Sequence, residues 1–410
     1  NEMQIMRQRE RCIHWFEKGG RQMNRFLKQA IDDKEEMIGN RRFLHRNPEI
    51  GDDLPITAKF VSEKLTEYGI PNKEICKCGI VGIIGGKKPG KTVMLRTDMD
   101  ALPIKENSGL PFSADNGYGH CCGHDLHTTM LLEAAKILKS CEDELCGTVK
   151  LMFQPGEEVF IGSRAMIDAG VLHDPEVDIA VDMHMNARNP VGTVAVCHGY
   201  TCASCDGMKL TVKGKGCHGA WPHTGIDPIN VAAHTYLALQ ELIAREAPAD
   251  KTVTLTFGQF AGGNAANIIP EEVVMQGTMR MFDPELREKL RKRVHEIVDY
   301  TALAFGAKTE YEVLSDVPAM YTNPELLDEM MRYCEDLDIK YIPYPPSSAS
   351  DDYARITELV PSVFFSIGCK PDGDGPTYPA HNPKIVFNED ALPYGAAIHA
   401  QCAFEYLKNN

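Results

Sequence analysis

One short stretch of the sequence, residues 120–127, carries a high density of groups that bind metal ions. It holds three histidines, two cysteines and one aspartate. Imidazole nitrogens and thiolate sulfurs are preferred ligands of Zn²⁺ and of its neighbours in the transition series. A histidine ligand usually holds a carboxylate on its other ring nitrogen, and Asp98, Asp100 and Asp125 are available for that role. We therefore predict a metal site here, with a helix N-terminus, packed thiols and a capping Asp125 as the simpler alternative.

A second candidate for chemistry is the acidic pair Glu157-Glu158, which follows a strand-like run and a Pro-Gly turn. Two adjacent carboxylates suit hydrolysis at a metal. One can bind the ion, while the other accepts a proton from the attacking water and passes it to the leaving amine. Acidic pairs are common on surface loops, so this pair alone is a weak signal. His184 and His381 are single histidines, and their interest comes from their position in loops after strand-like runs.

The elements that must position these residues alternate between strands and helices. Helix is predicted from about residue 28 to residue 67, with interruptions at Pro48 and Pro55, and again over 124–139. Strand-like runs that end in polar or glycine-rich loops occur at 80–84, 92–95, 149–153, 179–181 and 363–367. This alternation predicts an α/β fold with a mainly parallel sheet flanked by helices. Ligands bind beyond the carboxyl ends of such strands, where the carboxylate and histidine clusters occur.

The segment 203–316 follows a different pattern. Strand-like runs alternate with helices that begin at Asp227-Pro228 and Asp283-Pro284, in the order β-α-β-β-α-β. That order is ferredoxin-like. We therefore expect residues 1–202 and 317–410 to form one domain and 203–316 to form an inserted α+β domain. Two domains are also the default for a chain longer than ~250–300 residues.

Composition excludes several classes of function. The 410 residues carry a formal net charge of −15, which argues against a surface for nucleic acid or anionic lipid. No run approaches the ~18 apolar residues of a membrane span. Residues 1–34 are polar and lack the apolar run of a signal peptide. Fourteen cysteines without such a leader predict reduced thiols in the cytoplasm rather than a disulfide framework.

Short motifs occur in a fixed order along nearly the whole chain, from about residue 42 to residue 400. They are RTDMDALP (96–103), HCCGHDLH (120–127), QPGEE (154–158), MH (183–184), KGKGCHGA (213–220), PH (222–223), NIIP (267–270), GTMR (277–280), SDDY (350–353) and AHNP (380–383). In these motifs the chain resembles the M20 metallopeptidases. Within that family it is most similar to the branch of hippurate hydrolases, auxin-conjugate hydrolases and N-acyl-amino-acid amidohydrolases.

The resemblance implies a zinc-exopeptidase-like catalytic domain with an inserted lid and dimerisation domain. It implies two divalent metal ions (Zn, Mn, Co or Ni) and removal of the acyl group from small N-acyl amino acids. Glu157 is implied as the general base and acid. The implied metal ligands are Cys122, which bridges the two ions, His124, Glu158, His184 and His381.

Residues of the inserted domain have implied roles as well. His218 would reach the active site of a partner subunit in a homodimer and stabilise the oxyanion, and Asn267 and Arg280 would hold the substrate. Cys121 and Cys217 depart from the family pattern, and we expect Cys217 to pack rather than react. Two alternatives stay open. One is a dipeptidase or an N-acetyl-diaminopimelate deacetylase of the same fold, and the other is a metal-binding homologue without turnover.

Overall fold

The computed structural model describes residues 23–410 apart from residue 374. Residues 1–22, which make up most of the polar N-terminal stretch 1–34, lie outside the described residues. The described chain divides into two compact units. The first contains the described residues up to His198 together with Thr322–Tyr344 and Leu359–Asn410, and the second contains Gly199–Tyr321 and Pro345–Glu358.

Three helices form the start of the described chain, where the sequence predicts interrupted helix. They are α2 (Arg25–Asp32), α3 (Lys34–Arg46) and α4 (Pro55–Glu67). The side chain of Asn24 caps α2 by accepting hydrogen bonds from the backbone N–H groups of Phe26 and Leu27. Pro55 occupies the first turn of α4, where a missing N–H costs no hydrogen bond. Pro48 lies in the gap between α3 and α4, so both prolines interrupt the helices where predicted.

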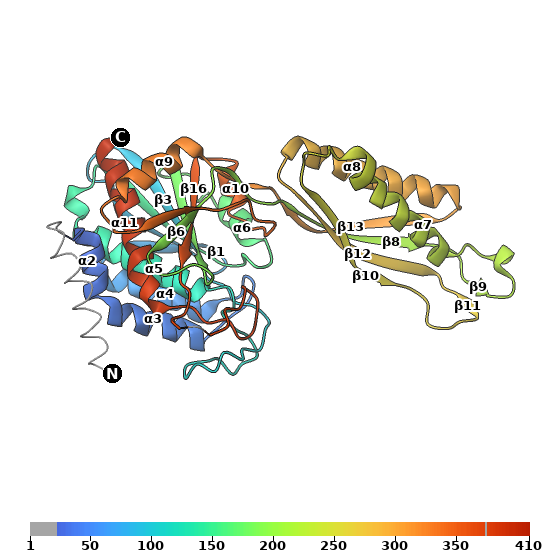
Figure 1. The fold of residues 1–410 in the computed structure, drawn as a ribbon, viewed down its shortest axis with the longest axis horizontal. Coiled ribbons are helices and arrows are strands. Elements are labelled where there is room, and N and C mark those ends of the chain that lie inside the picture. Colours follow the sequence, from blue (N-terminus) through green and yellow to red (C-terminus); the bar gives the residue numbers. More distant parts are fainter. Residues whose placement is uncertain (1–22, 374) are drawn as a thin grey trace. The chain divides into compact units, whose positions relative to one another are not determined.

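The first unit is built on one eight-stranded sheet (Figure 1). In order across the sheet its strands are β1 (Asn72–Cys76), β2 (Gly79–Gly85), β4 (Gly147–Gln154), β3 (Lys91–Asp98), β5 (Ile179–Asn186), β16 (Ser362–Gly368), β6 (Thr193–Val196) and β15 (Lys340–Pro343). The neighbours β4, β3, β5 and β16 pair in parallel, and antiparallel pairs flank them. The prediction of a mainly parallel α/β sheet is confirmed.

Two long helices, α5 (His124–Ser140) and α11 (Leu392–Asn409), contact each other and β3. α2 contacts α11, so the two ends of the described chain lie side by side (blue and red in Figure 1). The sequence predicted one apolar face for α5, yet almost every residue of this helix is buried. The remaining helices of the unit are α6 (Gly162–Asp168), η1 (Glu142–Glu144), α9 (Pro324–Tyr333) and η4 (Glu389–Ala391). None of the helices between residues 23 and 410 is long and apolar enough to cross a membrane.

The second unit contains a four-stranded antiparallel sheet in the order β10, β12, β8, β13. Its main elements are β8 (Cys205–Lys213), α7 (Pro228–Glu241), β10 (Val253–Ala261), β12 (Glu272–Met281), α8 (Pro284–Ala304) and β13 (Lys308–Val317). Asp227 and Asp283 cap the two helices through their side chains, as their Asp-Pro sequences predict. The smaller elements are β7 (Gly199–Cys202), β9 (Cys217–His218), η2 (Pro222–Thr224), η3 (Leu242–Glu246), β11 (Ile268–Ile269), β14 (Met320–Thr322) and α10 (Ala354–Thr357). The ferredoxin-like order of elements is thus present.

One buried carboxyl group of the first unit makes folding stability depend on pH. Glu133 of α5 is 2% exposed, and its Oε1 has no hydrogen-bond partner among the described residues. Burial, together with the nearby Asp33 carboxylate, raises the pKa of Glu133 to about 9 against the opposing charge of Lys136. The folded chain keeps a proton that the unfolded chain releases near the ordinary pKa of 4.5. Stability therefore falls as pH rises from the lower of these values to the higher.

We expect Glu133→Gln to raise the free energy of unfolding at pH 8 by about 1–3 kcal/mol and to flatten its decline between pH 5 and pH 8. Urea unfolding of both proteins across this range measures the effect. Glu63→Gln is a suitable control, because the ion pair of Glu63 with Lys59 is exposed. If the decline with pH is as steep in the Glu133 variant as in the wild type, this carboxyl group does not cause it.

Candidate metal centre

The central parallel strands bring predicted site residues to one edge of the sheet. β3 ends at Asp98, and β4 ends at Gln154, shortly before Glu157 and Glu158. His184 lies near the carboxyl end of β5. Because β3 pairs in parallel with both β4 and β5, these ends meet at the same edge. This is the edge at which α/β sheets bind their ligands.

Six of the predicted residues form three overlapping groups of possible metal ligands. The groups are Cys122, His124 and His184; Cys122, Glu158 and His381; and His124, Glu157 and Glu158. Within each group the ligand atoms lie within 4.8 Å of one another. Cys122, His124 and Glu158 each belong to two of these groups. The overlap of the groups suits a pair of neighbouring metal ions.

A glycine turn places Cys122 and His124 on the same cluster. Gly123 lies between them with a φ of 102°, in the left-handed region that favours glycine. A Cβ at this position would also lie 3.2 Å from the ring of Phe387 and 3.3 Å from the Cβ of Met185. The chain can therefore turn between the thiol and the first residue of α5 only because residue 123 has no side chain.

Two buried polar atoms in the cluster lie at distances from their neighbours that suit metal ligands. Nε2 of His124 lies 3.6 Å from Oδ2 of Asp98, and Oε1 of Glu158 lies 3.4 Å from Nε2 of His381. Nε2 of His124 lies 3.9 Å from Oε1 of Glu158 and 4.0 Å from Oε2 of Glu157. These separations are too long for hydrogen bonds but suit ligands of one ion at ~2.0–2.2 Å. Imidazole, thiolate and carboxylate together suit Zn, Mn, Co or Ni, so the residues present fit the two predicted ions.

The charges of the cluster favour the thiolate form of Cys122. Burial and the Glu158 carboxylate disfavour that form, but the imidazoles of His184 and His124 outweigh them and lower the pKa of Cys122 to about 6. Nε2 of His184 lies 3.3 Å from the Cys122 sulfur, and this contact raises the pKa of His184 to about 9 despite burial. Hydrogen bonds to Cys122 and Glu158 raise the pKa of His381 to about 10. The thiolate is the form of cysteine that binds metal.

Each aspartate proposed as a histidine partner contacts a different histidine. The contacts to Nδ1 are from Asp98 to His127 at 2.7 Å, from Asp100 to His124 at 3.3 Å and from Asp125 to His45 at 2.8 Å. Nε2 of His127 also accepts a hydrogen bond from the backbone N–H of Met185. Both nitrogens of His127 are therefore engaged within the protein. Of the three aspartates, only Asp100 contacts a predicted metal ligand through this ring atom.

Asp100 connects three parts of the centre. Its Oδ1 accepts a hydrogen bond from the backbone N–H of Glu157 at 3.2 Å, and its Oδ2 accepts one from the N–H of Glu158 at 3.1 Å. Its Oδ1 also faces the ring of His124. We expect Asp100→Asn to weaken metal binding by about 10- to 100-fold, because the amide N–H₂ cannot accept one of these hydrogen bonds.

Metal affinity of this variant is measured by competition with a chelating dye, and hydrolysis is assayed at low and saturating metal. Activity should recover largely at saturating metal, because the direct ligands are intact. A folded variant with wild-type metal affinity would remove Asp100 from this role. Thermal unfolding of the metal-free proteins separates a general loss of stability from a local one.

A buried network around Asp125 was missed by the sequence analysis. Arg41 is 1% exposed and donates from Nε to Oδ2 of Asp125 at 2.7 Å. The imidazole of His45 contacts the same oxygen and also Oε1 of Glu106, at 3.1 Å. The network ties α3 to the start of α5, the helix that carries His124. The spacing of four residues between Arg41 and His45, which places both on one helix face, was the available signal.

Two other side chains of the 120–127 stretch take no part in the three groups of possible ligands within residues 23–410. Burial lowers the pKa of His120 to about 3 and raises that of Cys121 to about 12. Cys121 contributes through its backbone, since its carbonyl oxygen accepts a hydrogen bond from the N–H of His381 at 2.9 Å. The geometry thus places the sulfur of Cys122, rather than that of Cys121, among the possible ligands.

The other predicted residues, His218, Asn267 and Arg280, lie in the second unit. β9 pairs with β11, which holds His218 beside the segment that carries Asn267. Nδ1 of His218 accepts a hydrogen bond from the N–H of Ala220 at 3.1 Å. This contact places the ring proton on Nε2 and leaves that atom as a donor. Arg280 of β12 donates from Nη1 to Oγ of Ser350 at 2.7 Å.

Comparison with known proteins assigns these features to one family. The model of peptidase family M20/M25/M40 matches residues 94–405. Thermostable carboxypeptidase 2 of Saccharolobus solfataricus is 35% identical over 387 residues, covering 93% of this chain and 98% of that protein. N-acetyl-L-cysteine deacetylase of Bacillus subtilis is 34% identical over 379 residues, covering 92% and 89%. A Bacillus subtilis crystal structure, described as a dinuclear metal binding peptidase from the M20 family, has a TM-score of 0.78 at 29% identity and covers 92% and 99%.

Proposed function

The chain belongs to peptidase family M20/M25/M40, and on this premise we propose that it removes the acyl group from small N-acyl amino acids. The products are a carboxylic acid and a free amino acid. As a member of this family the chain is an amidohydrolase that uses two divalent metal ions. The observation that carries the proposal is the acidic pair Glu157-Glu158 within overlapping sets of metal ligands. We place the reaction in the cytoplasm, because the thirteen cysteines among the described residues are all free thiols.

The ligand set explains what the metal ions contribute. Held by Cys122, His124, Glu158, His184 and His381, they would polarise the amide carbonyl and lower the pKa of water. His124 begins the buried helix α5 and His184 lies in β5, while Cys122 and Glu158 lie in the short turns before α5 and after β4. His381 is fixed through its backbone N–H. The protein therefore supplies a preorganised site, which limits the reorganisation that catalysis requires.

We assign the proton transfers of the reaction to Glu157. It is 6% exposed, and its backbone N–H is held by Asp100. Its Oε2 lies 4.0 Å from Nε2 of His124, beside the ligand set. A carboxylate in this place accepts a proton from the attacking water and passes it to the amide nitrogen as the bond breaks. Glu158 has the neighbouring position, and its Oε1 lies 3.4 Å from Nε2 of His381 and 3.9 Å from Nε2 of His124, which suits a metal ligand rather than a base.

We assign substrate contacts to the second unit. The guanidinium of Arg280 suits a free α-carboxylate, because it can form two parallel hydrogen bonds with the two carboxylate oxygens. Asn267 would assist in holding the substrate. The Nε2–H of His218 is a donor for the oxyanion that forms as water attacks the carbonyl. One well-placed donor of this kind contributes ~3 kcal/mol in other enzymes.

The proposal is tested by amine release from N-acetyl, N-benzoyl and longer N-acyl amino acids, assayed beside dipeptides. Cleavage of one acyl series in preference to every dipeptide supports it. Preference for dipeptides favours the second candidate, a peptidase, which is also the activity named for the 35% identical carboxypeptidase. Activity on N-acetyl-diaminopimelate alone would assign the chain to deacetylation of that compound. Metal binding without any turnover would favour a non-catalytic homologue and contradict both assignments.

We also propose that the active form is a homodimer joined through the second unit. The two packed helices α7 and α8 expose large apolar side chains, of which Leu237, Tyr300 and Leu303 are 63%, 69% and 70% exposed. Exposed apolar groups of this size favour an interaction surface. His218 lies in this unit, where it would be available to the active site of the second subunit.

Mixing of two inactive variants tests the homodimer. His218→Ala and Glu157→Ala should each be inactive, whereas their equal mixture after exchange should regain roughly a quarter of wild-type activity. That fraction follows because half of the dimers are mixed and each mixed dimer has one complete site. Light scattering gives the mass of each sample. A fully active monomer, or a dimeric mixture that stays inactive, contradicts the proposed contribution of His218 across subunits.

A further inference from the structure

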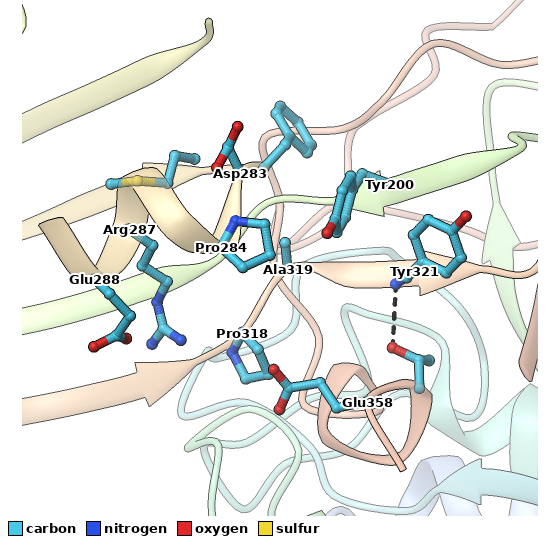
Figure 2. A pocket seen from close by; sticks show the side chains of 12 residues that line it. Tyr200, Asp283, Pro284, Arg287, Glu288, Pro318, Ala319, Tyr321 and Glu358 are labelled. Carbon is cyan, nitrogen blue, oxygen red and sulfur yellow. Dashed lines mark hydrogen bonds between the residues drawn. The ribbon is translucent and has the colours of Figure 1, made fainter. Parts of the chain in front are cut away.

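The second unit contains a pocket of about 550 Å³ that none of the residues assigned above lines. Its walls come from β7, from the end of β12 and the start of α8, from the chain around β14 and from the end of α10. Figure 2 shows Tyr200 and Tyr321 at one side of this pocket, with Pro284, Pro318 and Ala319 next to them. The volume lies within the range of small-molecule sites in proteins.

Two aromatic rings give the pocket an electron-rich wall. The rings of Tyr200 and Tyr321 meet edge to face, with centroids 5.1 Å apart and an interplanar angle of 73°. Tyr321 is 38% exposed, and its backbone N–H is held by Oγ1 of Thr357 (dashed in Figure 2). The faces of such rings attract organic cations, especially where water is partly excluded. The adjoining prolines and alanine offer an apolar surface for the body of a ligand.

The cationic group in the pocket wall is already paired. Arg287 of α8 is 8% exposed and forms hydrogen bonds with both oxygens of Asp206. It also forms an ion pair with Asp316. The guanidinium of Arg355, three residues before Glu358, donates to the backbone carbonyl of Asp316. A ligand anion would have to displace these contacts, so the wall does not favour a carboxylate or phosphate.

One carboxylate of the wall is left without a partner. Asp283 pairs with Lys251 at 2.9 Å, and Glu288 pairs with Arg291 at 3.3 Å. Glu358, directly after α10, has neither a hydrogen bond nor an ion pair from its side chain within the described chain. Burial raises its pKa, and the more distant charges of Arg287 and Arg355 only oppose this in part. A cationic partner would therefore stabilise the ionised form of this carboxylate.

We propose that this pocket binds a small organic ammonium ion, whose charged group pairs with Glu358 and whose apolar body lies against Tyr200 and Tyr321. A primary amine on an aromatic or branched aliphatic body has the required chemistry. Both parts of the ligand are needed, because the prolines and tyrosines contact its apolar body and Glu358 pairs with its charge. For a ligand of this size we expect a Kd on the order of 1 mM.

Phenethylammonium chloride is the probe, with 2-phenylethanol and 3-phenylpropionate as neutral and anionic controls of similar shape. Binding to the full-length protein is measured by calorimetry and by ligand-observed NMR. The amine should bind at least fivefold more tightly than either control. Glu358→Gln should weaken amine binding at least fivefold, and Tyr321→Ala should weaken it as well. Glu312→Gln, at an exposed ion pair with Lys209, should leave it unchanged.

These measurements can overturn the proposal in three ways. Equal binding of the amine and the alcohol would show that charge is not recognised. Amine binding that is unaffected by Glu358→Gln would place the site elsewhere. Absence of binding up to 20 mM amine would show that the pocket takes no such ligand. Glu358 is exposed, so its amide variant should fold, and thermal unfolding of each variant checks this.

Discussion

Replacing Glu157 by glutamine should remove nearly all turnover and leave the metal content unchanged. The side chain keeps its size, and the backbone hydrogen bond to Asp100 is not altered. The amide, however, cannot accept a proton from water or deliver one to the leaving nitrogen. We expect kcat to fall by about 10³- to 10⁴-fold, in the upper part of the range for loss of a general acid–base group. Steady-state hydrolysis and metal analysis are made on the same sample.

The neighbouring residue provides a matched control for this prediction. Glu158→Gln makes the same chemical change one residue later, but Glu158 is assigned as a metal ligand that shares a group with Cys122 and His381. It should lower metal affinity, and part of its activity should return at high metal concentration. Activity of the Glu157 variant should not respond to added metal. Near-normal turnover in Glu157→Gln would remove this residue from the mechanism.

Replacing Cys122 by serine should abolish the paired metal site. Its sulfur belongs to two of the three ligand groups, and the surrounding imidazoles favour its thiolate form by lowering its pKa to about 6. A serine hydroxyl stays protonated at neutral pH and is a much weaker ligand for these metals. We expect at least a 100-fold loss of kcat/KM and a loss of bound metal, both measured after equilibration with limiting metal.

Cys121→Ser is the control for that substitution. Cys121 is an adjacent buried thiol that belongs to none of the ligand groups among the described residues, and burial raises its pKa to about 12. It should keep its metal and most of its activity. If Cys121→Ser lost the metal and Cys122→Ser kept it, the metal ligand would be Cys121 and the assignment of Cys122 would be wrong.

Local sequence patterns predicted the elements because strands and helices are largely determined by short-range periodicity. The strand-like runs before Asp98, before Glu157 and before His184 are all strands, and the Asp-Pro signals at residues 227 and 283 begin helices. Helices α7 and α8 therefore start within one residue of the positions predicted. The same patterns could not show that α5 is buried on almost all sides, since that burial comes from its contacts with α11, α3 and β3.

The site could be predicted only in part from the sequence, because it depends on contacts between segments that are distant in the chain. Cys121 and Cys122 are adjacent in the sequence, so only the family resemblance favoured Cys122 as the ligand. In the structure, the turn at Gly123 brings the sulfur of Cys122 into the cluster. The sequence offered three aspartates as partners for histidines, but only folding shows that Asp100 faces His124. The contact of Arg41 with Asp125 joins two helices, and the spacing of Arg41 and His45 on one helix face does not identify Asp125 as their partner.

A metal titration of the chelated protein tests the assigned metal centre, with bound metal and amine release measured in the same samples. Zn, Mn, Co and Ni are added in separate series, using the substrate that the acyl panel selects. We expect no activity without metal and a rise that saturates near two equivalents per chain with at least one of these ions. The Cys122→Ser protein should show no such rise. Full turnover by the metal-free protein would contradict the assignment of this cluster as the catalytic centre.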